Sequence, residues 1–162
     1  MGLRHAEEQD LPRIVEIYNS SIASRRSTAD TEAVTIESRL QWFRKHHPEF
    51  RPLLVYEQEE KVVGWISFED FYGRPAYQRT AELSIYIAPE NQGKQLGKRL
   101  LRAAEEIAPE LGLHTLVGYV FAHNTPSMRL LQAHGFQEWG RLPDIAEMDG
   151  DNYSLCIMGK RL

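Results

Sequence analysis

A glycine-bearing turn rich in positive charge carries the clearest chemical signal in this sequence. Residues 89–99 read Pro-Glu-Asn-Gln-Gly-Lys-Gln-Leu-Gly-Lys-Arg, and they join an apolar stretch to one with helical periodicity. Such a strand-to-helix junction points unpaired backbone N–H groups at one spot, with the helix dipole behind them. Lys94, Lys98 and Arg99 add positive charge around it. The turn is therefore predicted to bind an anion such as a pyrophosphate.

Two better-known phosphate motifs do not fit this turn. In a Walker A loop, four residues separate the glycines and Lys-Ser/Thr follows, whereas Gly93 and Gly97 have three residues between them and Arg99 follows Lys98. The dinucleotide fingerprint G-x-G-x-x-G is absent as well. From the residues alone, an ordinary sharp turn with solubilising Lys and Arg stays an alternative.

A second candidate for chemistry is the loop over residues 72–77, which reads Tyr-Gly-Arg-Pro-Ala-Tyr. An arginine beside aromatic rings suits a carboxylate or phosphinate, because the guanidinium fork matches two oxygens. We therefore expect substrate contacts from Arg74, Pro75, Ala76 and Tyr77. The alternative is a plain surface loop with a turn glycine.

Other reactive residue types are less informative. Cys156 is the lone cysteine and lies in an apolar run, so we expect it in the core, without a disulfide, in a reducing cytoplasm. His46 and His47 are adjacent and would face different sides of a helix, which makes them a poor metal pair. We predict no metal site.

Alternating helical and strand patterns surround these residues. Asp10 before Leu11-Pro12 indicates a helix start, and Asp149-Gly150 is a strong hairpin signal. The predicted order is β-α-α-β-β-β-α-β-α-β-β. Its strands cover residues 3–6, 53–57, 62–68, 80–88 and 114–121 and two segments around the 149–150 turn; its helices follow residues 10 and 35, the latter ending at 48, and cover 96–108 and 126–134.

Length and composition bound the class of protein. The 162 residues suit a single domain over 1–162, and 42% hydrophobic residues suffice for a core. We expect an α/β (α+β) fold with a mixed, mostly antiparallel sheet flanked by helices. No apolar run approaches the roughly 20 residues that cross a bilayer, and residues 1–5 show no secretory pattern. A net charge of −4 argues against nucleic-acid binding.

The turn and a downstream segment resemble the GNAT superfamily of N-acetyltransferases. Its pyrophosphate loop has the pattern Gln/Arg-x-x-Gly-x-Gly/Ala; Gln92 and Gly97 match, while Gln95 replaces the usual middle glycine. Residues 124–127, Asn-Thr-Pro-Ser, and 131–136, Leu-Gln-Ala-His-Gly-Phe, resemble the second signature, Asn-x-x-Ala/Ser followed by Gly-Phe. The resemblance covers nearly the whole chain, and the superfamily has the element order predicted above.

Within the superfamily, the chain looks most similar to the phosphinothricin and methionine sulfone (sulfoximine) acetyltransferase-like branch. The residues that carry this resemblance are 17–19 (Ile-Tyr-Asn), 67–68 (Ser-Phe), 72–77, 82–87 (Glu-Leu-Ser-Ile-Tyr-Ile), Pro143 and 149–150 (Asp-Gly).

The resemblance implies acetyl-CoA as the co-substrate. Backbone groups of Ile85 and Ile87 would hold the pantetheine arm as an added strand does. Residues 93–98 would hold the pyrophosphate. Asn124 should reach the cofactor too, although a plain helix N-cap is the other interpretation and both roles are compatible. The full expected cofactor set is Ile85, Tyr86, Ile87, Gly93, Lys94, Gln95, Leu96, Gly97, Lys98 and Asn124.

The chemistry that the resemblance implies needs a base, because an α-amine with a pKa near ~8 is mostly protonated at neutral pH. Glu82 is the predicted catalytic residue and substrate contact, acting through a water. A strand-end carboxylate, in solvent or in an ion pair with Arg79, is the structural alternative. Many members protonate the leaving thiolate with a tyrosine where this chain has Leu131. We assign no general acid, and we expect Tyr86 to point to the wrong face of its strand.

Taken together, these features predict an acetyl-CoA-dependent N-acetyltransferase that transfers acetyl directly to a small amino-acid-like amine. Phosphinothricin, methionine sulfone and methionine sulfoximine are the leading substrate candidates. The alternatives are acetylation of a protein or peptide N-terminus and a non-catalytic acyl-CoA-binding sensor. The resemblance also implies a homodimer, although no feature of the sequence itself points to one.

Overall fold

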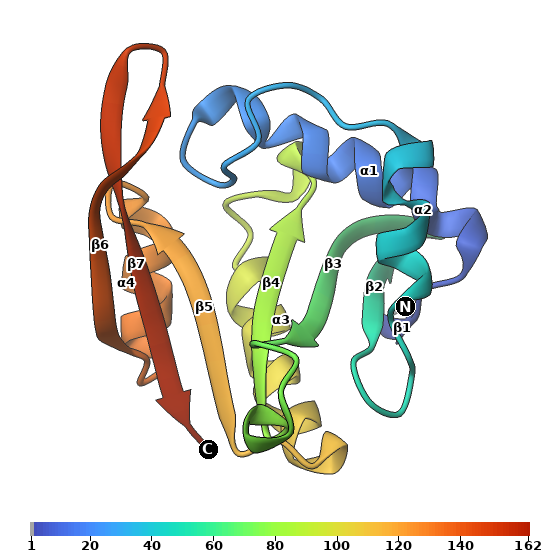
Figure 1. The fold of residues 1–162 in the computed structure, drawn as a ribbon. Helices are drawn as coiled ribbons and strands as arrows, with labels where there is room; N and C mark the ends of the chain where they lie inside the picture. The colour runs from blue at the N-terminus through green and yellow to red at the C-terminus, as the bar shows by residue number, and fades with distance from the viewer. Residues whose placement is uncertain (1) are drawn as a thin grey trace.

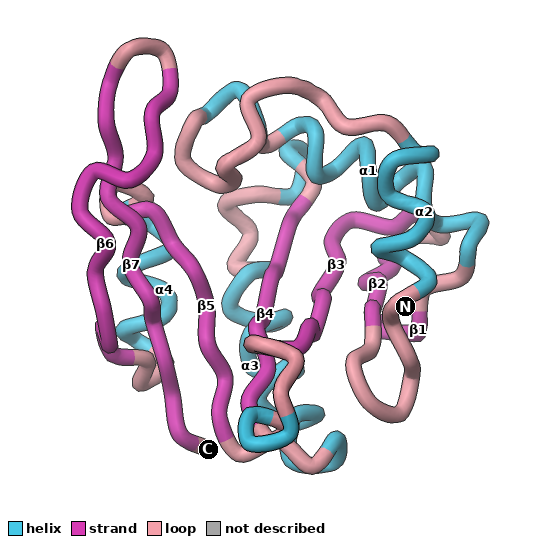
Figure 2. The backbone as a smooth tube through the Cα atoms, in the orientation of Figure 1, coloured by secondary structure: helices cyan, strands magenta, loops and turns pink. Residues whose placement is uncertain are grey.

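The computed structural model describes residues 2–162, and its strands form one seven-stranded sheet (Figures 1 and 2). The strand order is β1-β2-β3-β4-β5-β7-β6. All neighbouring pairs are antiparallel except β4 and β5, which are parallel. The predicted mixed, mostly antiparallel sheet is therefore confirmed. The strands are β1 (Gly2–His5), β2 (Leu53–Gln58), β3 (Lys61–Asp70), β4 (Thr80–Ile87), β5 (Thr115–Phe121), β6 (Gln137–Met148) and β7 (Asp151–Arg161).

Four α-helices cover the two faces of the sheet in pairs (Figure 1). The core on one face includes side chains of α1 (Leu11–Ser20) and α2 (Ile36–Arg44). The core on the other includes those of α3 (Leu96–Ile107) and α4 (Thr125–Ala133). None of the helices over residues 2–162 is long and apolar enough to span a membrane. The predicted order of elements is confirmed.

Local sequence signals explain where the helices begin. Thr35 caps α2 by accepting from Ser38 N at 3.1 Å, and Asn124 caps α4 by accepting from Ser127 N at 3.3 Å. Asp10 precedes α1 as predicted, but its carboxylate makes no helix cap. It instead accepts from both terminal nitrogens of Arg4, at 2.8 and 2.9 Å. That pair ties the start of α1 to β1.

The predicted end of the second helix was wrong by one turn. We expected α2 to reach Pro48, whereas it ends at Arg44. The chain turns away because His46 is drawn to the sheet: its Nδ1 donates to Trp42 O at 2.9 Å, and its Nε2 lies 2.7 Å from Ser67 Oγ. This contact places α2 over β3, beside the site described below.

Candidate acetyltransferase site

The predicted anion turn adopts two left-handed backbone positions. After a single 3₁₀ turn at Pro89–Asn91, Gly93 has φ 78° and Gln95 has φ 60° with ψ 21°. Glycine takes this conformation readily, whereas a residue with a side chain pays for it. Gln92 donates from Nε2 to Ile87 O at 3.3 Å and so ties the turn back to the end of β4.

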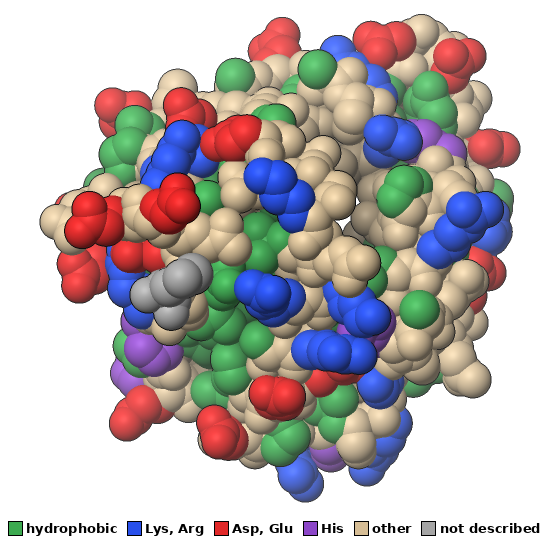
Figure 3. Space-filling model, turned by 180° about the vertical axis from the view of Figure 1, so that it is seen from behind, with side chains coloured by type: hydrophobic (Ala, Val, Ile, Leu, Met, Phe, Trp, Pro, Cys, Tyr) green, Lys and Arg blue, Asp and Glu red, His purple; other side chains and the backbone are tan. Residues whose placement is uncertain are grey.

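The amino end of α3 is open to a ligand. Gln95 is its N-cap residue and supplies no side-chain cap, so the first-turn N–H groups stay available. Seen from behind, Lys and Arg side chains gather near the middle of the face that α3 and α4 cover (Figure 3). Lys98, Arg99 and Arg102 line a surface hollow with Gln95 there. The backbone and charge together suit a phosphate-bearing ligand.

The parallel strands β4 and β5 separate just beyond Glu82. They pair only from Thr80 with Thr115 to Glu82 with Val117, and then diverge toward the anion turn (Figure 1). On this side, the backbone edge of β4 that carries Ile85 and Ile87 has no strand beside it. An extended amide-bearing chain could therefore pair with that edge.

Alternation along β4 puts two sets of side chains on opposite faces. Ile85 and Ile87 pack against the core under α3 and α4, while Tyr86 packs against the core under α1 and α2. Tyr86 stacks on Trp65, with ring centroids 4.8 Å apart, and donates to Ser27 O at 3.0 Å. Burial raises the pKa of its phenol. Our expectation for the face of Tyr86 was wrong: period-2 alternation gives it the same face as Glu82.

Three cross-strand pairs of β3 and β4 build this shared face. They are Trp65 opposite Tyr86, Ser67 opposite Ser84, and Glu69 opposite Glu82. The face thus runs from aromatic rings, through hydroxyls, to a pair of carboxylates at the point where β4 leaves β5.

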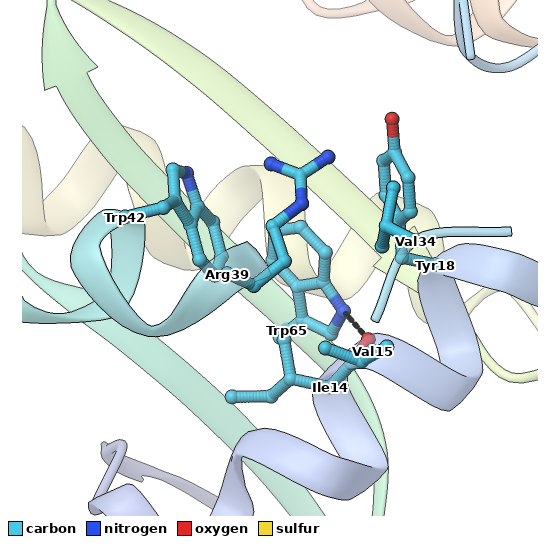
Figure 4. A pocket seen from close by; sticks show the side chains of 7 residues that line it. All are labelled: Ile14, Val15, Tyr18, Val34, Arg39, Trp42 and Trp65. Atoms are coloured by element: carbon cyan, nitrogen blue, oxygen red, sulfur yellow. Dashed lines mark hydrogen bonds between the residues drawn. The ribbon is translucent and has the colours of Figure 1, made fainter. Parts of the chain in front are cut away.

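The aromatic end of this face is closed by residues of α1 and α2 (Figure 4). Trp42 packs edge-on against Trp65, with centroids 5.5 Å apart. The guanidinium of Arg39 lies 4.7 Å from the centre of the Tyr18 ring and 5.5 Å from that of Trp42. A small apolar gap lies among these side chains. This end is packed, whereas Glu69 and Glu82 at the other end are half-buried.

Glu82 is half-buried and free of the ion pair that we had weighed as its alternative. Arg79 donates instead to Gly112 O at 3.1 Å. Burial, and then the charge of Glu69, raise the pKa of Glu82 above its ordinary value. Tyr119 of β5 lies two residues beyond Val117 on the same face, and burial followed by the charge of Glu82 raises its pKa. The half-buried carboxylate of Glu82 therefore holds a proton more readily than an exposed glutamate does.

The predicted substrate loop joins β3 to β4 at the Glu82 end. The loop follows Asp70, the last residue of β3, which pairs in the sheet with Ala81 near the start of β4. Arg74 precedes a 3₁₀ turn over Pro75–Tyr77, and all of these residues are exposed. The rings of Tyr72 and Tyr77 lie edge-on, 6.0 Å apart.

Buried Arg51 anchors this loop from beneath. Its Nε donates to Asp70 Oδ1 at 2.8 Å, and one terminal nitrogen donates to Gln78 O at 2.7 Å. The ends of the loop are therefore fixed, while Arg74 extends into solvent.

Asn124 lies at the far side of the β4–β5 opening, and its side chain is already hydrogen-bonded to other residues of the protein. Besides capping α4, it donates from Nδ2 to Arg26 O at 3.1 Å. His123 beside it donates to Arg25 O at 2.7 Å, while Tyr86 holds Ser27 from β4. Residues 25–27 consequently bridge the two sides of the opening. The N-cap role of Asn124 is present, and its cofactor role stays a prediction.

Two further expectations concern Cys156 and the helix α4. Cys156 is a free, buried cysteine, as predicted, with its thiol 3.4 Å from Glu138 Oε1.

Leu131 packs partly against the core and offers no proton to a leaving group. Within residues 2–162, no group of three or more His, Cys, Asp or Glu side chains is arranged to hold a metal ion.

Sequence reasoning missed Glu69, Ser67, Ser84 and Tyr119. The signal for the first two was present, since Trp65-Ile-Ser67-Phe-Glu69 alternates apolar residues with polar or aromatic ones. What the sequence did not show was the register that sets Glu69 opposite Glu82.

Known structures reproduce this arrangement of elements closely. A crystal structure described as a "putative phosphinothricin N-acetyltransferase" is 55% identical, with a TM-score of 0.96, covering 99% of this chain and 97% of that one. A phosphinothricin acetyltransferase from Sinorhizobium meliloti in complex with acetyl-CoA is 27% identical with a TM-score of 0.91, covering 99% and 87%. A ribosomal-protein-alanine N-acetyltransferase from Brucella melitensis is 33% identical with a TM-score of 0.92, covering both chains fully, at 100% each. The fold and site thus define an acetyltransferase.

Sequence relatives agree with this class. The "Putative phosphinothricin acetyltransferase YwnH" of Bacillus subtilis (strain 168) is 56% identical over 100% of this chain and 99% of its own length. The L-methionine sulfoximine/L-methionine sulfone acetyltransferase of Salmonella typhimurium is 30% identical over 100% and 95%. The acetyltransferase (GNAT) family profile matches residues 11–136. The chain therefore belongs to the GNAT family, and the predicted acetyl-CoA-dependent N-acetyltransferase is confirmed.

Proposed function

We propose that this enzyme acetylates the primary amine of a small amino-acid-like substrate, with Glu82 as the general base. The observation that carries the proposal is the position of Glu82 where β4 leaves β5, on the face that it shares with Ser84 and with Glu69 of β3. Its raised pKa, due first to burial, makes the carboxylate a better proton acceptor than an exposed glutamate.

The cofactor-binding part of the proposal rests on backbone geometry. Ile85 and Ile87 offer the free edge of β4 to the pantetheine amides. The left-handed turn from Gly93 to Gln95 and the uncapped start of α3, Leu96 to Lys98, offer N–H groups and charge to the pyrophosphate. Acetyl-CoA, when bound, supplies the thioester that carries the acetyl group.

The proton and bond changes balance without a covalent enzyme intermediate. Glu82 takes one proton from the substrate ammonium, directly or through a water. The freed nitrogen forms a C–N bond with the acetyl carbon as the C–S bond breaks, and the second N–H proton of the adduct is lost to water so that a neutral amide forms. The electron pair leaves with sulfur. A thiol pKa near ~8.5 lets that thiolate leave unaided, which is consistent with a leucine at position 131. A backbone N–H on the free edge of β4 would stabilise the oxyanion.

We infer a substrate with an anionic or tetrahedral head, such as phosphinothricin, methionine sulfone or methionine sulfoximine. The names of the relatives from Bacillus subtilis and Salmonella typhimurium support this class. Arg74 would grip the head group, with Pro75, Ala76 and Tyr77 beside it, because its loop is fixed at the Glu82 end of β3 and β4.

A second candidate substrate is a protein N-terminus. The observation that favours it is the 33% identical structure of a ribosomal-protein-alanine N-acetyltransferase from Brucella melitensis. Both substrate classes present a primary amine, so the same base would serve either one.

We further infer a homodimer in the cytoplasm. The long edge strand β6 exposes Trp139, Leu142 and Ile145, which a second copy could cover. The free thiol of Cys156 fits a reducing compartment.

The substitution Glu82→Gln tests the proposed base. It removes the proton acceptor with little change in shape, so kcat/KM at pH 7 should fall by roughly 10²–10⁴-fold. The loss should shrink as pH rises, because the amine then deprotonates in solution. The affinity for acetyl-CoA, measured by calorimetry, should be unchanged. Glu110→Gln, at an exposed site beyond α3, serves as the control. Wild-type activity of Glu82→Gln at pH 7 would show that the proton goes elsewhere.

A further inference from the structure

Glu69 forms a like-charged pair with the proposed base. It lies directly opposite Glu82 in the register of β3 and β4. Directly opposite residues on one face have Cβ atoms roughly 4.5–5.5 Å apart, so the two carboxylates point into the same space. Both residues are half-buried. Like charges in this arrangement destabilise a sheet unless something positive joins them.

Two arginines near this pair, Arg51 and Arg79, are engaged with other groups, and Arg74 of the loop is exposed. Arg51 pairs with Asp70, and Arg79 donates to Gly112 O. His46, which lies just beyond the end of α2, is no source of charge either: burial lowers the pKa of its imidazole, and the charge of Glu69 offsets this only in part. Its Nδ1 donates to the Trp42 carbonyl, so its Nε2 accepts from Ser67. None of these groups pairs with Glu69 or Glu82, so a cationic substrate would supply the positive charge that completes the pair.

The remaining titratable group at this point is on β5. Tyr119 lies on the same face, and its pKa is raised by burial and by the charge of Glu82. It therefore stays a neutral phenol at physiological pH, while the charge of Glu69 contributes to the raised pKa of Glu82. Glu82 thus faces a carboxylate from β3 and a phenol from β5, while the imidazole of His46 lies near Glu69.

We propose that Glu69 is a positioning residue: its carboxylate holds the incoming substrate ammonium beside Glu82 and makes Glu82 the member of the pair that takes the proton. This inference rests on the proposed function of Glu82. It adds a requirement on the substrate, namely that it enters as a cation. One positive charge between two carboxylates relieves their repulsion, and the proton that then passes to Glu82 leaves Glu69 as the single negative charge of the pair.

The substitution Glu69→Gln tests this role through the pH profile of kcat/KM. Removing the negative charge should make Glu82 lose its proton more readily, so the acid limb should move to lower pH, by up to about one unit. The amine KM should rise about 2- to 5-fold, since one partly exposed ionic contact is lost. The KM for acetyl-CoA should not change. Glu69→Asp, which keeps the charge, should return the acid limb toward that of the wild type.

The controls separate this inference from the one on which it rests. Glu110→Gln should leave the profile and both KM values unchanged, because it removes a remote exposed charge. If Glu82→Gln abolishes activity but Glu69→Gln leaves both the acid limb and the amine KM of the wild type, the role of Glu69 is overturned and Glu82 stands. If Glu82→Gln is fully active, the proposed base itself has failed. Since Glu69→Gln removes a repulsion, its melting temperature should not fall, and a fall would contradict the pairing.

Discussion

At the scale of single residues, Gln95 has a strained backbone conformation inside the anion turn, and this strain costs folding free energy. Its left-handed backbone, with φ 60°, is the conformation that the usual glycine of such a loop adopts without strain. The sequence marked this position as unusual, because glutamine replaces glycine there. It could not show that the turn keeps the glycine-like backbone, since a side chain might have shifted it. The structure shows that the turn is retained and the residue is strained.

Gln95→Gly should therefore stabilise the free protein. A side chain in a left-handed conformation costs roughly 1–2 kcal/mol, of which the flexibility of glycine takes back about 0.5–1. The net gain of up to about 1.5 kcal/mol corresponds to a rise in melting temperature of up to about 3–6 °C, measured without ligand.

Lys94→Gly is the matched control, because Lys94 is not among the left-handed residues of this turn. There, glycine brings only flexibility, so the melting temperature should fall slightly. A fall for Gln95→Gly as large as that for Lys94→Gly would mean that the glutamine side chain makes a stabilising contact.

At the scale of elements, the site depends on how β3, β4 and β5 are joined. The β3–β4 pairing aligns Glu69 with Glu82, and the early separation of β4 from β5 exposes a backbone edge beside them. The strands themselves could be predicted, because their residues alternate and turn signals flank them. The separation could not, because it depends on a pairing between segments that are far apart in the chain, and neither segment differs in pattern from an ordinary strand.

The same limit explains the wrong end of α2, whereas the face of Tyr86 could have been read from local alternation. The end of α2 at Arg44 depends on a contact of His46 with Ser67, a partner 21 residues away. The face of Tyr86 follows from alternation along β4 once Glu82 is placed on the open face. Of the predicted site, the anion turn and the strand with Glu82 could be predicted from their own short segments of sequence. The place of Glu69 beside Glu82 could not, because it depends on the register of β3 against β4.

Arg51 is the element-scale contact that is most open to test, because it holds the loop between β3 and β4. Arg51→Ala removes its bonds to Asp70 and to Gln78 O, and should destabilise the fold by about 1–3 kcal/mol in urea unfolding. With the loop loosened, the amine KM should rise while the acetyl-CoA KM is unchanged.

Arg44→Ala is the control for this change. Arg44 also pairs with a carboxylate, but both it and Glu8 are exposed, so the loss should be below about 1 kcal/mol. Equal stability losses in the two variants, or an unchanged amine KM in Arg51→Ala, would contradict the anchoring role.

At the scale of the whole molecule, the two halves of the reaction meet along one opening. The anion turn and the free edge of β4 lie toward the end of that strand, while the carboxylates lie near its start. Residues 25–27 cross the opening and are held from β4 by Tyr86 and from the end of β5 by His123 and Asn124. Cofactor and amine would thus approach the same point from different sides, as direct transfer requires.

The most direct test of the central claim is a side-by-side amine panel in which release of the CoA thiol is followed at fixed acetyl-CoA. The panel holds phosphinothricin, methionine sulfone, methionine sulfoximine, ordinary amino acids, polyamines and short peptides with an alanine N-terminus. We predict that one of the three amino-acid analogues has the highest kcat/KM, and that its thiol release falls by at least about 10²-fold in Glu82→Gln. Higher kcat/KM for peptides or polyamines than for every analogue would contradict the proposed substrate class, and no thiol release with any amine would contradict the enzyme itself.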